Sequence, residues 1–148
     1  MGVEVSGIVK LDGIKGRRVD MELTLRPGDA QHLYHKFAVR FAQNDKYYTA
    51  LSFRPKESIL KVDRKFSGSR RAIIHQRRSQ VNHRGGNSVD GELKLRMILD
   101  RYSVEIFVND GEQVMTATMY TEQEAEGISF FADGIVNIDV VKYDLAID

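Results

Sequence analysis

The chain has 148 residues, of which 42% are hydrophobic and 29% are charged, and this balance predicts one folded domain over residues 1–148. It has no cysteine, which excludes disulfides, thiolate metal sites and a cysteine nucleophile, and no apolar run long enough to cross a membrane. The formal net charge is +1, which argues against a uniformly basic nucleic-acid-binding protein.

Short runs of alternating apolar and polar residues predict β-strands, because successive side chains of a strand point to opposite faces. The last run changes parity, and we expect a β-bulge near Val140 at that point. In chain order, the predicted strands cover residues 19–25, 37–41, 47–53, 93–99, 102–108, 114–120, 128–132 and 136–147.

Asp-Gly pairs stand between or next to these runs and predict chain reversals, since this dipeptide accommodates left-handed turn geometry. The four pairs are Asp12-Gly13, Asp90-Gly91, Asp110-Gly111 and Asp133-Gly134. Many short strands separated by tight turns favour two facing antiparallel sheets. The predicted fold is therefore all-β, a two-sheet antiparallel sandwich of the jelly-roll type.

Residues 64–91 interrupt the pattern and predict a long loop around at most one strand, at residues 71–76. Charge is concentrated here: residues 54–84 carry ten Lys and Arg against two Asp and Glu, whereas residues 85–148 carry four against thirteen. One interpretation is that the basic stretch contacts the acidic half or an acidic partner. Another is anion binding, but we expect a solvated loop and no nucleic-acid partner. The arginines concerned are Arg70, Arg71, Arg77, Arg78 and Arg84.

Motifs for nucleophilic or metal-dependent catalysis are missing from the sequence. There is no Gly-x-Ser-x-Gly element, no Walker loop and no dinucleotide-binding glycine pattern. His32 and His35 are three residues apart, but this spacing ahead of a strand does not place two imidazoles side by side. The sequence therefore predicts no catalytic triad, no metal and no cofactor.

Carboxylates and arginines near strand ends are the remaining candidates for a binding site. They are Asp63 and Arg64, Asp100 and Arg101, and Glu105. One interpretation is that each Asp-Arg pair forms a local hydrogen-bonded clamp at a strand end. The other is that these groups surround the hydroxyls of a bound saccharide. Sequence spacing does not decide between the two.

Two segments together resemble a known family. They are residues 93–112 (LKLRMILDRYSVEIFVNDGE) and residues 60–68 (LKVDRKFSG). They are similar to the C-terminal β-sandwich module of family 32 glycoside hydrolases, which include invertases, levanases and sucrose-6-phosphate hydrolases. Tyr102 stands where the family usually has serine.

This resemblance implies a function without catalysis in these residues. The family's catalytic motifs lie in an N-terminal β-propeller, and neither its Trp-containing motif nor its Asp-Pro motif occurs here. The resemblance implies an accessory module that packs on and stabilises the propeller of its own parent chain, with Met1 standing in place of the propeller and linker. Within this family, the lack of cysteine, of a signal segment and of Asn-x-Ser/Thr sites favours a bacterial, cytoplasmic enzyme of sucrose or sucrose 6-phosphate over a secreted plant or fungal invertase.

The alternative function is a lectin-like module that binds fructose or fructan. In that case Asp63, Arg64, Asp100, Arg101 and Glu105 would contact the sugar. The absence of tryptophan argues against it, because sugar sites often use large aromatic rings.

Overall fold

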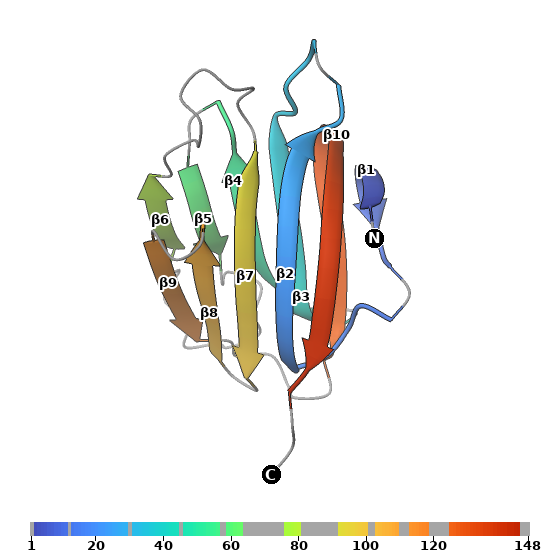
Figure 1. Cartoon of the computed structure of the whole chain (residues 1–148). Helices are drawn as coiled ribbons and strands as arrows, with labels where there is room; N and C mark the ends of the chain where they lie inside the picture. The colour runs from blue at the N-terminus through green and yellow to red at the C-terminus, as the bar shows by residue number, and fades with distance from the viewer. Residues whose placement is uncertain are drawn as a thin grey trace.

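The computed structural model describes residues 2–11, 13–29, 31–44, 46–56, 59–63, 76–80, 92–100, 103–109, 113–118 and 125–145. These residues form ten strands and no helix (Figure 1), so the prediction of an all-β fold is confirmed. The strands are β1 (Gly2–Val9), β2 (Arg18–Pro27), β3 (Lys36–Gln43), β4 (Thr49–Arg54), β5 (Ile59–Asp63), β6 (Gln76–Gln80), β7 (Leu93–Asp100), β8 (Ser103–Val108), β9 (Gln113–Thr118) and β10 (Gly127–Asp144).

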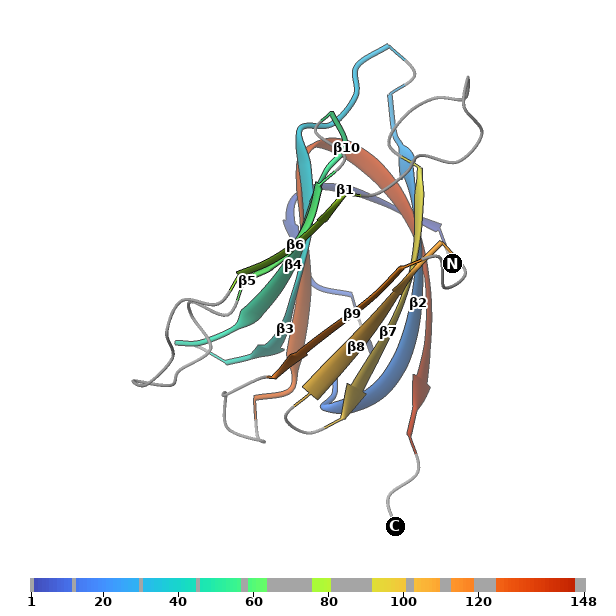
Figure 2. The same ribbon diagram turned by 90° about the vertical axis from the view of Figure 1, so that its left-hand side faces the viewer.

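The strands form two layers that share β10. Their order is β6-β5-β4-β3-β10-β2-β7-β8-β9, with β1 also paired to β10. Residues 127–133 of β10 pair with β3, and residues 136–144 pair with β2, in both cases antiparallel. Figure 2 shows β10 arching over one end of the molecule from one layer to the other. We call these the β3 layer and the β2 layer, and they confirm the predicted two-sheet antiparallel sandwich.

The core lies between the layers and follows from the alternation in sequence. On β2, residues 19, 21, 23 and 25 are fully buried, and on β7 residues 93, 95, 97 and 99 are buried opposite them in register. Aromatic rings fill the space near the bend of β10: Phe37 stacks near Phe130 with centroids 6.4 Å apart, and Tyr34 is tilted against Phe53 at 6.5 Å. Burial raises the pKa of the Tyr34 hydroxyl.

The bend of β10 replaces a predicted reversal. Asp133-Gly134 was expected to end a strand, but β10 continues through it and changes layer, so this prediction is wrong. Gly134 has a φ of +107°, and a Cβ there would lie 2.8 Å from the Cα of Tyr34. Glycine is needed here because the strand must bend sharply while another backbone passes close to it.

The predicted bulge at Val140 is also wrong. Pairing between β10 and β2 runs from Val136 opposite Pro27 to Asp144 opposite Val19 without a register shift. The change of parity in the sequence arises because Val141 and Tyr143 are apolar residues on the outer side, where they are 41% and 62% exposed.

The strands predicted at residues 93–99 and 102–108 correspond to β7 and β8, which form a hairpin and pair from Leu95 opposite Val108 to Asp100 opposite Ser103. Several other predictions fall outside the described residues: most of the strand predicted at 71–76, and the reversals at Asp90-Gly91 and Asp110-Gly111. At Asp12-Gly13 only the glycine is described, and its φ of +77° is left-handed as expected.

Candidate functional site

Asp63 is the last residue of β5 and points outward from the β3 layer, because Leu60 and Val62 occupy the inward positions. Its carboxylate lies 3.9 Å from the Nζ of Lys61, and both side chains are about one quarter exposed. Arg64, its predicted partner, lies outside the described residues.

Asp100 and Glu105 point outward from the β2 layer, at the closed end of the β7–β8 hairpin. Ser103 Oγ donates a hydrogen bond to the backbone oxygen of Asp100 at 3.3 Å. The Nε of Arg18, on the neighbouring strand β2, lies 3.5 Å from Asp100 Oδ1. Arg101 lies outside the described residues, so the described partner of Asp100 comes from another strand.

The structure therefore brings two of the predicted residues to one surface and separates the third. Asp100 and Glu105 share the outer face of the β2 layer, whereas Asp63 is on the outer face of the β3 layer. Two packed sheets about 10 Å apart lie between these faces. One saccharide ring does not reach all three carboxylates.

The outer face of the β2 layer, hereafter the β2 face, carries charges that pair with one another. Arg96 donates two hydrogen bonds to Asp20, from Nε to Oδ1 at 3.0 Å and from Nη2 to Oδ2 at 2.6 Å. These bonds, together with the positive charge, lower the pKa of Asp20. Further along the face, Arg26 Nη1 lies 3.5 Å from Asp139 Oδ2.

The β2 face also carries apolar side chains between these pairs. Val141, Tyr143 and Val114 are 41%, 62% and 55% exposed. Phe107 and Ile98 are partly buried on the strands between them. Val141, Glu22, Arg96, Phe107 and Val114 follow one another in register across five strands.

The outer face of the β3 layer, hereafter the β3 face, is formed by β3, β4 and β5 and carries mostly positive charge. Its outward residues include Lys36, Arg40, Arg54 and Lys61. Partial burial lowers the pKa of Lys36, and the charges of Arg54, Lys61 and Arg40 lower it further. The Arg40 guanidinium lies over the ring of Tyr48, 4.7 Å from its centroid.

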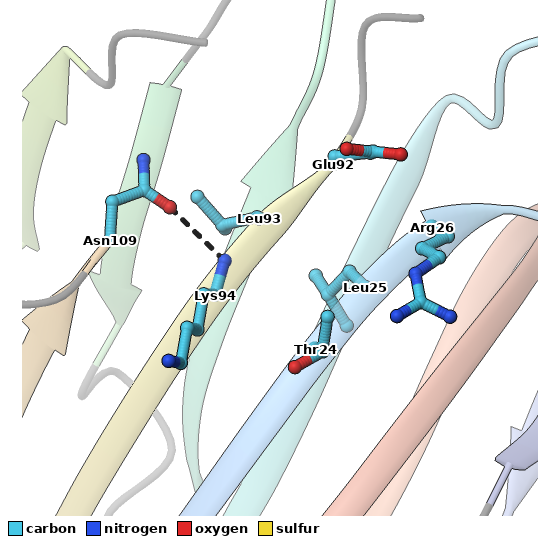
Figure 3. A pocket seen from close by; sticks show the side chains of 7 residues that line it. All are labelled: Thr24, Leu25, Arg26, Glu92, Leu93, Lys94 and Asn109. Carbon is cyan, nitrogen blue, oxygen red and sulfur yellow. Dashed lines mark hydrogen bonds between the residues drawn. The ribbon is translucent and has the colours of Figure 1, made fainter. Parts of the chain in front are cut away.

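A pocket of about 210 Å³ opens at the end of β2 and β7 (Figure 3). Asn109 makes two hydrogen bonds with Lys94 at its edge. The side-chain Oδ1 of Asn109 accepts from the Lys94 backbone N–H at 3.1 Å, and the backbone N–H of Asn109 donates to the Lys94 backbone oxygen at 2.8 Å. The pocket is lined by Thr24, Leu25, Arg26, Glu92, Leu93, Lys94 and Asn109.

The pocket residues were not predicted, because strand register brings them together. The Asn-Asp-Gly sequence after a strand was the available signal, since asparagine adopts the left-handed backbone that Asn109 has, with a φ of +48°. The lining supplies two cations, a carboxylate, a hydroxyl and an amide. These groups can hydrogen-bond saccharide hydroxyls, but none of the described residues that line the pocket is aromatic.

Metal-binding geometry does not occur in the part of the chain that the structure describes: no three His, Asp or Glu side chains gather there. His32 Nδ1 lies 3.1 Å from Asp29 Oδ2 in an exposed turn, and the His35 N–H donates to the Asp133 backbone oxygen at 2.8 Å. Within the same residues no helix is long and apolar enough to span a bilayer.

Comparison with known proteins identifies relatives of the whole chain. The profile of the family described as "Glycosyl hydrolases family 32 C terminal" matches residues 3–145. The chain is 30% identical over 138 residues to a sucrose-6-phosphate hydrolase of Staphylococcus xylosus, covering 92% of this chain and 26% of that protein. It is 29% identical over 119 residues to a levanase of Bacillus subtilis, covering 77% of this chain and 16% of that levanase. The chain thus spans about a quarter or less of these relatives.

Solved structures show the same fold. An exo-inulinase of Aspergillus awamori superposes with a TM-score of 0.79 at 19% identity, covering 99% of this chain and 29% of that one. A sucrose-6-phosphate hydrolase of Lactobacillus gasseri gives a TM-score of 0.67 at 21% identity, covering 98% and 28%. Since the family profile matches nearly all of the residues, the chain belongs to the C-terminal domain family of family 32 glycosyl hydrolases.

Proposed function

We propose that this chain is the non-catalytic C-terminal module of a glycoside hydrolase that acts on β-fructofuranosides, and that it packs on and stabilises the catalytic domain of the same longer chain. The match to a C-terminal domain family over residues 3–145 carries this proposal. The share of the relatives that the chain covers also supports it, because roughly three quarters of each relative lies outside the matched segment.

The placement of the carboxylates supports a role without hydrolysis. Glycoside hydrolysis usually needs two carboxyl groups roughly 5–9.5 Å apart on either side of a bound sugar. Asp20 and Asp100 each lie beside a cation from a neighbouring strand, and Asp63 lies beside Lys61. The hydrogen bonds from Arg96 lower the pKa of Asp20, so this carboxylate suits a structural ion pair better than a general acid.

The first test is hydrolysis by the 148-residue chain alone. We expect no release of fructose or its phosphate from sucrose, sucrose 6-phosphate or levan. Hydrolysis above that of a heat-denatured sample would overturn the proposal that the module is non-catalytic.

The second test concerns packing on the catalytic domain. This chain is fused in place of the matching segment of the Staphylococcus xylosus sucrose-6-phosphate hydrolase, and unfolding is followed by calorimetry. We expect a single transition, above the melting temperature of that enzyme lacking its last segment, because a binding partner stabilises the folded state. Two independent transitions would contradict packing.

The substrate and location are proposed from the relatives. The bacterial relatives include sucrose-6-phosphate hydrolases, so we propose a phosphorylated disaccharide as substrate of the longer chain and the bacterial cytoplasm as its location. A phosphorylated sugar is charged and crosses an apolar bilayer poorly, so it stays in the compartment where it forms.

Fructose or fructan binding stays a prediction. The division of Asp63 from Asp100 and Glu105 between two faces leaves no common site for them among the described residues. The pocket at Arg26, Lys94 and Asn109 is the alternative place for a sugar. Calorimetric titration with fructose and levan, repeated with Arg26→Ala, tests it: heat that the variant abolishes supports the pocket, and no heat at millimolar sugar excludes the module as a sugar-binding domain.

A further inference from the structure

We propose that the catalytic domain of the longer chain docks on the β2 face, with Val141, Tyr143, Phe107 and Val114 at the contact and the Arg96–Asp20 pair at its centre. This inference rests on the proposed function and adds the surface through which the module acts.

Exposed apolar side chains favour this face. Among the described residues five large apolar side chains are strongly exposed, and three of them, Val114, Val141 and Tyr143, lie on the β2 face. Phe107 joins Val141 and Val114 in one register row across the layer. Glu22 and Arg96 lie in the same row, so the gain comes from its three apolar side chains, at about 25 cal/mol for each Å² of apolar surface removed from water.

Arg18, Arg26 and Arg96 on the β2 face add less to the cost of docking than unpaired cations would, because each already lies beside a carboxylate. Arg96 binds Asp20 through two hydrogen bonds, and Arg18 and Arg26 lie beside Asp100 and Asp139. Burying a cation without a partner costs several kcal/mol, whereas a hydrogen-bonded pair keeps its partner when water leaves.

The β3 face would be expensive to bury. Continuing the register one step beyond the Phe37–Phe53 pair sets Lys36 opposite Arg54, so two like charges face each other across neighbouring strands. Among the described residues, three cations on this face lower the pKa of Lys36, and the carboxylate of Asp63 raises it. A partner without matching acidic groups would therefore avoid this face.

The path of a longer chain favours the same side. The family is described as C terminal, so the rest of a longer chain precedes Val3. The first residues of β1 pair with β10 inside the β2 layer, from Gly2 opposite Asp139 to Val5 opposite Val136. Figure 1 shows this end of β1 beside β10 at the edge of the layer. A preceding domain is thus connected at the rim of the β2 face.

The size of the face is sufficient for a stable contact. Five strands about 4.8 Å apart span ~19 Å, and eight residues of strand extend ~26 Å, which gives a projected area of ~500 Å². Protruding side chains raise the accessible area above that figure, towards the ~800 Å² that each partner contributes to a standard interface.

The test compares two exposed tyrosines by hydroxyl-radical footprinting. Tyr143 is 62% exposed on the β2 face, and Tyr47 is 41% exposed in the connection between β3 and β4. Both are measured in the isolated chain and in the fusion with the Staphylococcus xylosus catalytic segment. Docking that buries most of Tyr143 slows its oxidation roughly fivefold, because interface cores exclude water, and leaves Tyr47 unchanged.

Variants separate this inference from the proposed function. In the fusion, Val141→Ser with Tyr143→Ser is expected to split the single unfolding transition in two, whereas Ile8→Ser, at a similarly exposed position outside the β2 face, leaves it intact. A single transition with Tyr143 as reactive as in the isolated chain overturns the docking surface but keeps the proposed function. Two transitions in the unmodified fusion overturn both.

Discussion

The two outer faces of this sandwich are built on the same strand alternation but differ in how their charges are arranged. On the β2 face, cations lie beside carboxylates from neighbouring strands, as in the Arg96–Asp20 and Arg18–Asp100 pairs. On the β3 face, Arg40 and Arg54 have the same sign as Lys36 and disfavour its charged form. The comparison shows that a chain with a net charge of +1 can have two faces that differ in the free-energy cost of burying their charges.

The difference can be traced to the uneven distribution of charge along the chain. The basic stretch supplies Arg54 and Lys61 to the β3 layer, and the acidic half supplies Asp100, Glu105 and Asp139 to the β2 layer. The expected contact between the two stretches does not form among these residues, since they lie on opposite sides of the core. Instead, Arg18 and Arg26 of β2 lie beside Asp100 and Asp139 of the acidic half.

The largest effect on stability is expected from disrupting the bend of β10 at Gly134, through which the strand passes from one layer to the other. Gly134→Val places a branched side chain within 2.8 Å of the Tyr34 Cα at a φ of +107°. Strain and steric overlap together should lower the free energy of unfolding by about 4 kcal/mol, measured by urea denaturation.

Gly13→Ala is the matched control for this substitution. Gly13 also has a positive φ, +77°, but a Cβ there meets no atom within 4 Å. Backbone strain alone should cost about 1 kcal/mol. Equal losses for the two variants would show that the close approach to Tyr34 does not hold the layers together.

The next effect concerns the corner of the β2 face. Asn109→Ala removes a side-chain acceptor from the partly buried hydrogen bond of the Lys94 backbone N–H and leaves a residue with a Cβ at a φ of +48°. We expect a loss of about 2 kcal/mol in the free energy of unfolding. Asn109→Gly relieves the backbone and should lose less, so an equal loss in both variants would contradict a role for left-handed geometry.

A smaller effect is expected for the central ion pair of the β2 face. Asp20→Asn removes the charge that holds Arg96, and partly exposed pairs of this kind contribute about 1 kcal/mol. Because the pKa of Asp20 is lowered in the folded state, its contribution is complete above the unfolded pKa near 4 and is lost as pH falls through the lower folded pKa. Urea denaturation should therefore show a larger difference at pH 7 than at pH 2.

The strands were predictable because each strand buries one face, so that apolar and polar residues alternate along its sequence. This held for β2, β7 and β8, where buried and exposed residues alternate over the full length. β1 was not predicted, because Gly2 and Gly7 weaken its pattern and its register shifts between Val5 and Gly7. The continuity of β10 through Gly134 could not be seen either, since an Asp-Gly pair permits both a turn and a bend.

The surface chemistry was less predictable than the fold. The sequence drew attention to Asp100 because Arg101 follows it, yet the cation described beside it is Arg18, 82 positions earlier in the chain. The Asp20–Arg96 pair is likewise fixed by the pairing of β2 with β7. Spacing along the chain contains no information on such contacts, because they depend on which strands become neighbours and in which register.

The smallest effect, and the one of opposite sign, is expected on the β3 face. Lys36→Gln removes a cation opposed by Arg54 and should raise the free energy of unfolding by about 0.5 kcal/mol at low salt. The pKa of Lys36 is lowered in the folded state, so its charge destabilises at neutral pH and this cost disappears as pH rises past the unfolded value of about 10.4. Denaturation at pH 7 in ~0.01 M and ~1 M salt should show the gain in stability becoming smaller as screening increases.

Lys61→Gln is the control: it removes a cation 3.9 Å from Asp63 and should raise the free energy of unfolding by less than Lys36→Gln does. A loss of stability for Lys36→Gln at low salt would mean that the charges of the β3 face do not repel one another, and the contrast between the two faces would fail.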